Sequence, residues 1–231
     1  MANRKVPFAA GEYYHLYNRG NSRQKIFLDE DDYKHFTKCL FICNTNKNFK
    51  FRDHIVEKKI DAFDFQREDI LVSIGAWTLM PNHFHLYVTF SHKSDLWAEN
   101  SKRSKNNISE FMRKLMTAYT KYFNAKHHRT GTLYEGVFKS VRAQNDNHAK
   151  YLFSYIHLNP IKIIFPKWIE EGIANTKLAL EYLNSYKWSS YNDHRGTKRP
   201  ENKILELKDF PQYFSGLKDF DSEIFSWLEH E

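Results

Sequence analysis

Two apolar segments joined by a short turn constrain the fold more than any other feature of this chain. Residues 70–79 are rich in small and β-branched side chains, and residues 83–90 continue the apolar character. Between them lies Met80-Pro81-Asn82, a sequence typical of turns. Strands joined by so few residues pair antiparallel, because a parallel pair needs a crossover of a dozen or more residues. The sequence therefore predicts a β-hairpin within an antiparallel sheet.

The other periodic segments predict what surrounds this hairpin. Two more strands and three helices are expected, the strands at residues 12–17 and 137–143 and the helices at 31–44, 107–127 and 146–158. The order is strand, helix, two strands, helix, strand, helix. This order predicts an α+β fold close to the ferredoxin-like pattern, with two or three helices on one side of the sheet. Residues 45–67 are expected to form a loop or insertion. Trp- and Tyr-bearing loops and an acidic tail, with room for one more helix, are expected after Pro160.

Composition excludes several classes of protein. Hydrophobic residues make up 41% of the 231 residues, which allows a packed core and argues against wholesale disorder. No apolar stretch is long enough to predict a membrane-spanning helix, and the N-terminal residues lack the apolar run of a secretory signal. Two cysteines, Cys39 and Cys43, cannot form a disulfide framework, and we expect buried thiols in a reducing cytoplasm.

Positive charge is concentrated in one part of the chain. The net charge is +7, and residues 102–142 hold ten Lys or Arg against two Glu, a local charge of +8. A basic segment with interspersed aromatic residues, Tyr119, Tyr122 and Tyr134, suits a polyanion that carries stackable bases. A solvated basic face explains the same charges equally well.

The sequence His83-Phe84-His85 stands out inside the second strand of the hairpin. Because side chains alternate along a strand, both imidazoles face the same side, about 6–7 Å apart at a rise of roughly 3.3 Å per residue. Such a pair can bind one divalent cation, although a third protein ligand is needed. Ordinary histidines on a half-exposed strand face, or satisfied ones in the core, are the alternative.

The helix that ends before Pro160 carries a second candidate group. Tyr155 and Asn159 are four residues apart and therefore lie on one helix face. An Asn amide oxygen is an acceptable ligand for a hard cation, and a tyrosine beside a cation can act as a nucleophile. A core tyrosine followed by an Asn C-cap explains this segment as well. Tyr151, one turn earlier, is a rival nucleophile.

These two motifs together resemble those of a known family. Met80-Pro81-Asn82-His83-Phe84-His85-Leu86 and Tyr155-Ile156-His157-Leu158-Asn159-Pro160 are similar to the signature motifs of HUH single-tyrosine transposases, in particular the REP-associated tyrosine transposases. The segments at residues 14–21, 129–140 and 188–191 also resemble that family, so the resemblance spans roughly residues 10–192. It implies a transposase domain at 1–192, followed by a C-terminal extension at 193–231 of unknown role.

The resemblance implies a mechanism and a set of site residues. His83, His85 and Asn159 would be metal ligands, and Tyr155 the nucleophile in cleavage and rejoining of DNA through a 5′-phosphotyrosine. A His₂Asn site with substrate oxygens favours Mg²⁺ or Mn²⁺. The expected substrate is single-stranded or hairpin DNA near palindromic elements, in a cytoplasmic, chromosome-associated protein that is either a monomer or a homodimer. Expected phosphate contacts are Arg19, Arg23, Arg129, Lys139 and Arg142.

Other functions stay open at this point. A non-catalytic DNA-binding regulator on the same scaffold would share the basic segment but would not need Tyr155. A metal-dependent phosphodiesterase that uses water would leave Tyr155 as a structural residue. A purely structural zinc domain is disfavoured, because only two of the four usual ligands are identifiable.

Overall fold

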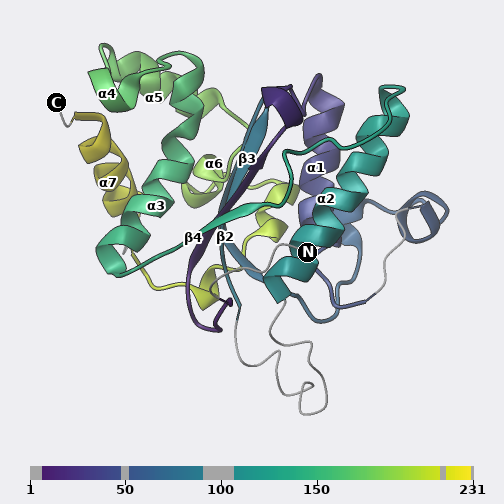
Figure 1. Cartoon of the computed structure of the whole chain (residues 1–231). Coiled ribbons are helices and arrows are strands. Elements are labelled where there is room, and N and C mark those ends of the chain that lie inside the picture. Colours follow the sequence, from purple (N-terminus) through teal and green to yellow (C-terminus); the bar gives the residue numbers. More distant parts are fainter. Residues whose placement is uncertain (1–6, 48–51, 91–106, 214–216, 230–231) are drawn as a thin grey trace.

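A computed structural model describes residues 7–47, 52–90, 107–213 and 217–229. Its centre is a four-stranded antiparallel sheet in the order β2-β3-β1-β4, formed by β1 (Tyr14–Arg19), β2 (Ser73–Met80), β3 (His83–Thr89) and β4 (Lys139–Arg142) (Figure 1). Helix α1 (Glu30–Ile42) connects β1 to β2, and α2 (Asn107–Lys126) lies between β3 and β4. This βαββαβ arrangement is the ferredoxin-like pattern, so the predicted α+β fold class is confirmed.

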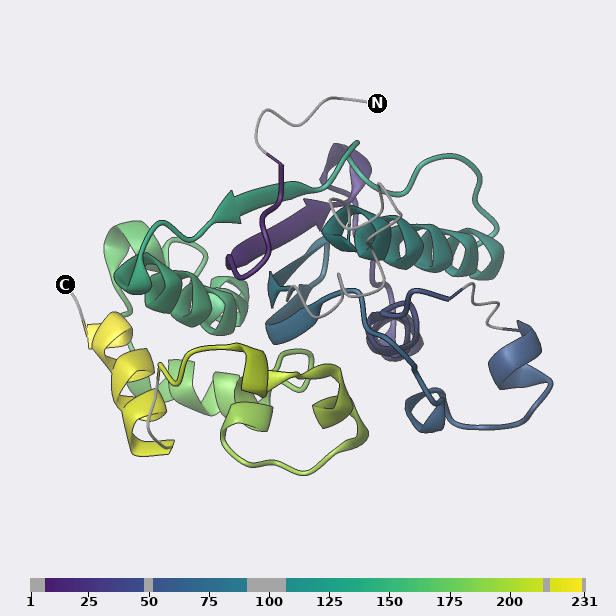
Figure 2. The same ribbon diagram turned by 90° about the horizontal axis from the view of Figure 1, so that it is seen from below.

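Helices cover both faces of the sheet, whereas the sequence analysis expected them on one side. Helices α1 and α2 pack on one face, and α3 (Asp146–Leu158) packs on the other (Figures 1 and 2). The strands carry apolar side chains on both faces of the sheet. Leu86 belongs to the core beneath α1 and α2, and its neighbour Tyr87 belongs to the core beneath α3. A sheet that is apolar on both faces needs a cover on both.

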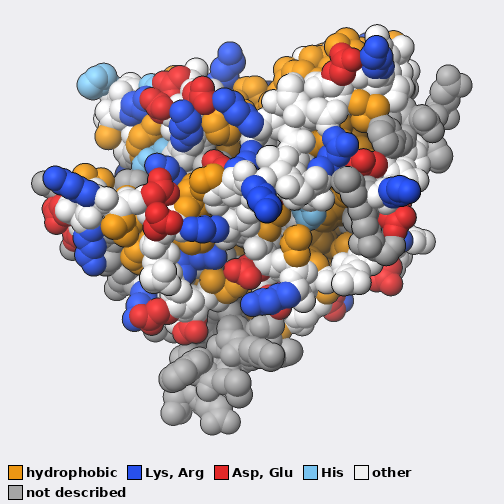
Figure 3. All heavy atoms as spheres, turned by 180° about the vertical axis from the view of Figure 1, so that it is seen from behind, with side chains coloured by type: hydrophobic (Ala, Val, Ile, Leu, Met, Phe, Trp, Pro, Cys, Tyr) orange, Lys and Arg blue, Asp and Glu red, His pale blue; other side chains and the backbone are white. Residues whose placement is uncertain are grey.

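The rest of the chain is more helical than expected. It forms α4 (Trp168–Glu171), α5 (Thr176–Ser185), α6 (Tyr191–His194) and α7 (Leu217–Glu229), with shorter helical turns at Asn21–Arg23, Arg52–Val56, Ala62–Asp64, Asn159–Ile163, Pro200–Ile204 and Leu207–Asp209. Among the described residues, no helix is long and apolar enough to cross a membrane. Figure 3 shows Lys and Arg side chains lying among Asp and Glu on the rear face, so positive charge is not gathered into one field there.

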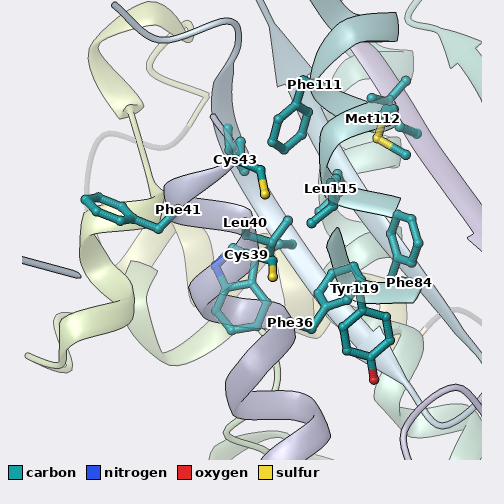
Figure 4. Packing of buried hydrophobic residues seen from close by; sticks show 14 of the residues in the cluster. Phe36, Cys39, Leu40, Phe41, Cys43, Phe84, Phe111, Met112, Leu115 and Tyr119 are labelled. Atoms are coloured by element: carbon teal, nitrogen blue, oxygen red, sulfur yellow. The ribbon is translucent and has the colours of Figure 1, made fainter. Parts of the chain in front are cut away.

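The core beneath α1 and α2 follows from helical spacing. Phe36 and Leu40 of α1 are four residues apart, and α2 presents Phe111, Leu115 and Tyr119 at the same interval. These side chains share one core with Phe84 of β3, whose ring contacts Phe36 (Figure 4). Asp29 caps α1 by accepting a hydrogen bond from the Asp32 backbone. The two cysteines, free and buried in this core, are the ordinary thiols that the sequence predicts.

The chain after α3 borders the edge strand β2 and adds to the cover on the α3 face. The Ser190 backbone N–H donates to the Trp77 carbonyl at 2.9 Å, and the Leu79 backbone N–H donates to the Trp188 carbonyl at 2.9 Å. The β2–β3 register shifts at Gly75, where the Phe210 ring lies over the backbone. Phe220 of α7 is buried in the core beneath α3. Residues of the expected C-terminal extension therefore pack into the same body as the sheet.

Candidate active site

The pairing register of the central strands gathers several polar side chains on the face that α3 covers. Tyr17 of β1 pairs with His85 of β3, and Arg19 pairs with His83. Paired residues project to the same side, so these four side chains and His15 share one face. Helix α3 is fixed across this face, where the Thr78 hydroxyl donates to its Ile156 carbonyl at 2.7 Å. His83 and His85 therefore lie on one face, as strand alternation predicts.

The two histidines use one ring nitrogen each in hydrogen bonds. His85 Nδ1 lies 2.7 Å from His15 Nε2, and His83 Nδ1 lies 2.6 Å from Asn82 Oδ1. The His83 and His85 rings are 4.9 Å apart and nearly perpendicular. Among the described residues, the buried His85 Nε2 has no hydrogen-bond partner. Its ring thus presents an unused nitrogen, which is the arrangement that a metal-binding imidazole requires.

Burial keeps these imidazoles uncharged at neutral pH. It lowers the pKa of His15 and of His83 to about 4, and nearby Lys162 and Arg19 add to the effect at His83. Burial also lowers the pKa of His85 well below its usual value. A neutral imidazole keeps the electron pair that a cation needs.

Helix α3 brings the predicted tyrosine to the same place. The half-buried Tyr155 ring lies 5.8 Å from the His85 ring and 6.0 Å from the His15 ring, edge-on to both. Lys162, in the turn that follows Pro160, donates from Nζ to Tyr155 Oη at 3.1 Å. The phenol therefore combines a cationic hydrogen-bond donor with a location beside the histidines.

Asn159 lies at the end of α3, fully buried. Its amide Nδ2 donates to the Tyr155 carbonyl at 2.8 Å, and its Oδ1 has no hydrogen-bond partner among the described residues. A buried carbonyl oxygen without a partner is uncommon in folded proteins. Asn159 Oδ1 and His85 Nε2 are thus two unpaired electron-pair donors, and amide oxygens and imidazole nitrogens are both ligand types that divalent cations accept.

A second group of metal-binding residue types is satisfied by the protein itself. Asp29, Asp32 and His127 bring ligand atoms within 4.8 Å of one another. The Lys126 ammonium lies 2.6 Å from an Asp29 oxygen and 2.9 Å from an Asp32 oxygen, and the Leu28 backbone N–H donates to Asp32. One ammonium already pairs with both carboxylates, so the group serves to join the start of α1 to the end of α2.

The candidate phosphate contacts are divided between the two faces. Lys139 pairs with Tyr17 and therefore shares the face of Arg19 and the histidines, whereas Arg142 pairs with Tyr14 on the face toward α1 and α2. Both arginines are in ion pairs, Arg19 with Glu135 and Arg142 with Glu12.

The other two candidate arginines lie away from the paired strands. Arg129 follows α2, its guanidinium 5.5 Å from the Phe123 ring, and Arg23 is exposed in the turn after β1. Lys102, Arg103 and Lys105 of the basic segment lie outside the described residues.

The tyrosines expected to stack on bases are not available for that role. Tyr119 and Tyr134 are buried in the core, and Tyr122 stacks on His35 at 3.6 Å. The helical period of α2 turns Tyr119 and Tyr122 toward α1, and Tyr134 is buried in the segment between α2 and β4; the charge of the segment does not reveal this. Nearer to the histidines, Tyr17 is half-buried and Tyr151 is 38% exposed.

The sequence analysis also missed two residues beside the site. His15 lies on β1, two residues before Tyr17, which pairs with His85. Residues two apart on a strand face the same side, and this spacing is the signal that could have identified His15. Lys162 had no comparable signal, because the turn after Pro160 brings it back to Tyr155.

Comparisons with known proteins add little detail. No family model matches the chain, and no curated protein sequence matches it significantly. The chain is similar to a solved structure described as "Structure of the REP associates tyrosine transposase bound to a REP hairpin", with 14% sequence identity, a TM-score of 0.44, and coverage of 87% of this chain and 90% of that chain. The assignment of the candidate site therefore rests on the geometry of this chain.

Proposed function

We propose that this protein is a metal-dependent enzyme that cleaves and rejoins single-stranded DNA through a covalent bond to Tyr155. One observation carries the proposal: the Tyr155 hydroxyl, held by the Lys162 ammonium, lies on a face that also holds two buried, unpaired donors, His85 Nε2 and Asn159 Oδ1. A bound cation would give both atoms the partner that they lack.

His83, His85 and Asn159 would hold the cation, Mg²⁺ or Mn²⁺. When bound, such an ion offsets the charge that develops on the nonbridging oxygens of a scissile phosphate. The two histidines are suited to this role because they are uncharged at neutral pH, and Asn159 adds a neutral oxygen. The absence of a carboxylate among these three leaves the positive charge of the ion available to the phosphate.

Tyr155 would attack phosphorus in line with the leaving oxygen. The Oη–P bond forms and the P–O3′ bond breaks, while the phenol proton is lost to solvent and the 3′ oxygen takes up a proton. The products are a 5′-phosphotyrosine and a free 3′-hydroxyl. A 3′-hydroxyl from the same or another strand can reverse the step, because the phosphodiester bond energy is kept in the covalent link.

Lys162 would act directly on the nucleophile. Its ammonium donates a hydrogen bond to Oη at 3.1 Å, and this bond becomes stronger as negative charge develops on that oxygen. In the reverse direction the same bond stabilises the departing phenolate. Lys162 is thus expected to accelerate cleavage and rejoining alike.

The surroundings of the site suit a single strand with its bases displaced. Arg19 and Lys139 share the face of the histidines and can contact phosphates, although Arg19 would have to exchange Glu135 for the DNA. Tyr17 and Tyr151 offer partly exposed rings for base stacking near Tyr155. Arg23, Arg129 and Arg142 would contact more distant DNA, such as the stem of a hairpin.

The proposal is tested by following the protein-linked product. A labelled hairpin oligonucleotide with a single-stranded flank is incubated with Mn²⁺ and the wild-type, Tyr155→Phe or Tyr151→Phe protein. We expect a labelled adduct that survives SDS with the wild type and with Tyr151→Phe, and none with Tyr155→Phe. Cleavage without an adduct would indicate that water is the nucleophile. DNA binding without any cleavage would favour the non-catalytic regulator.

A further inference from the structure

His15 of β1 makes a buried contact that the proposed reaction has not yet used. Its Nε2 lies 2.7 Å from His85 Nδ1, and both side chains are at most 5% exposed. The contact is diagonal across the β1–β3 pair, because His15 is directly opposite Tyr87 while His85 is opposite Tyr17. Resting on the proposed function, we infer that His15 is a positioning residue that makes His85 Nε2 the metal-binding nitrogen.

The number of hydrogens between the two rings supports this inference. An imidazole that binds a metal through one ring nitrogen carries its hydrogen on the other, so His85 can bind through Nε2 only if its hydrogen is on Nδ1. A nitrogen–nitrogen distance of 2.7 Å requires one hydrogen in the contact. Either His85 Nδ1–H donates to His15 Nε2, or His15 Nε2–H donates to His85 Nδ1.

Only one of these arrangements is compatible with a metal on His85. If His15 donates, the hydrogen of the His85 ring is on Nε2, where no acceptor exists among the described residues and where it would block a cation. If His85 donates, its Nε2 is bare and faces the cation as an electron-pair donor. A buried N–H without an acceptor is rare, so a metal on Nε2 needs an acceptor for Nδ1–H. His15 Nε2 is that acceptor.

The His83 ring also has a hydrogen-bond acceptor at Nδ1, supplied by Asn82. Its Nδ1 lies 2.6 Å from the Asn82 side-chain oxygen, the residue immediately before it in the turn. An amide oxygen can only accept, so the hydrogen of the His83 ring is on Nδ1 and its Nε2 is bare. The two imidazoles are thus held in the same tautomer, one by a neighbour in sequence and the other by a residue 70 positions away.

Contacts on both sides hold the His15 ring in place. It stacks on Tyr17 at 5.1 Å and meets the edge of the Tyr155 ring at 6.0 Å. The His15 side chain thus contacts both a proposed ligand and the proposed nucleophile without itself being a ligand. Its effect is expected in metal affinity and in the tautomer of His85.

The test measures Mn²⁺ binding to the full chain without DNA, by calorimetry and by the electron paramagnetic resonance of free Mn²⁺. His15→Leu removes the acceptor, and His15→Gln supplies an amide oxygen at a similar reach. We expect His15→Leu to weaken Mn²⁺ binding by about 10- to 100-fold and His15→Gln to restore most of that loss. His35→Leu, which removes a half-buried histidine of α1 on the opposite face of the sheet, is the matched control and should bind Mn²⁺ nearly as the wild type does.

A spectroscopic measurement on the wild type covers the case in which a variant fails to fold. In protein with ¹⁵N-labelled histidine, long-range ¹H–¹⁵N correlations report which nitrogen of each neutral ring bears hydrogen, and Zn²⁺ serves as the diamagnetic probe. We expect His85 to carry its hydrogen on Nδ1. A hydrogen on Nε2 with the metal bound, or equal Mn²⁺ affinity for folded His15→Leu and wild type, would overturn the role of His15 alone. A wild-type protein that binds no Mn²⁺ would overturn the metal-dependent function itself, and His15 with it.

Discussion

Replacing Lys162 by methionine removes the charge beside Tyr155 and keeps a side chain of similar length. In the wild type, Nζ lies 3.1 Å from Oη, within hydrogen-bond range, and 5.0 Å from the centre of the ring. A hydrogen bond to a charged group contributes about 1.5–3 kcal/mol, and each ~1.4 kcal/mol is tenfold in rate. Since Lys162 is only half-buried, the lower part of that range applies, and we expect Lys162→Met to slow cleavage by roughly 10- to 50-fold.

The assay is single-turnover cleavage with excess enzyme and a labelled oligonucleotide, followed by rejoining after addition of a strand with a free 3′-hydroxyl. Because Oη is the nucleophile in one direction and the leaving group in the other, both rates should fall by the same factor. The fraction of adduct at equilibrium should then stay unchanged, and Lys162→Arg should recover part of both rates. Unequal effects on the two rates, or weaker DNA binding with unchanged chemical rates, would refute a direct role at Oη.

Three further predictions concern stability and the metal. A Cβ at Gly75 would lie 2.8 Å from the Phe210 ring, so Gly75→Ala should lower the melting temperature by several degrees. A smaller residue at position 210 should recover part of this loss. An equal effect of Gly75→Ala with Phe210 and with the smaller residue would contradict the close approach. Burial lowers the pKa of His15 to about 4 and that of His157 well below its usual value, so the unfolded chain takes up protons first as the pH falls below about 6.5. Stability should then fall between pH 6.5 and 4, by up to about 1.4 kcal/mol per pH unit for each such group, and a free energy of unfolding that is flat over this range in urea titrations would contradict the burial. Finally, Asn159→Ala should weaken Mn²⁺ binding measured by calorimetry, whereas unchanged affinity would remove Asn159 from the ligand set.

Much of the fold could be predicted because its signals are local. The 146–158 helix has the observed bounds, since Asn145 caps it and Pro160 follows it. The hairpin follows from its turn, although β1 runs to Arg19 rather than Tyr17 because Arg19 pairs with His83. The strand pairing that extends β1 is a long-range contact, which no local pattern contains.

The expectations that failed concern how segments pack. Apolar periodicity identifies α3 as a helix but does not say which face of the sheet it covers, and both faces are apolar here. Helix α5 was expected to be a loop, although Asn175 caps it, because only Ala179 and Leu183 of that helix are fully buried and the apolar repeat is short.

The candidate site also has one part that local sequence patterns predict and another that depends on packing. Strand alternation places His83 and His85 on one face, and helical spacing places Tyr155 near Asn159, so both pairs could be anticipated from sequence. Their proximity across the sheet depends on where α3 lies, and the contributions of His15 and Lys162 depend on strand register and on a turn. The roles of all these residues remain predictions that rest on this geometry.

The most direct test of the covalent mechanism is to identify the residue that carries the DNA. After reaction with Mn²⁺ and the hairpin oligonucleotide, the adduct is digested with nuclease and trypsin and the nucleotide-bearing peptide is fragmented in a mass spectrometer. Tyr151 and Tyr155 lie in the same tryptic peptide, and the fragment ions distinguish them. We predict a nucleotide phosphate on Tyr155. Its presence on Tyr151, or cleaved DNA with no modified peptide, would contradict the assignment of Tyr155 as the nucleophile.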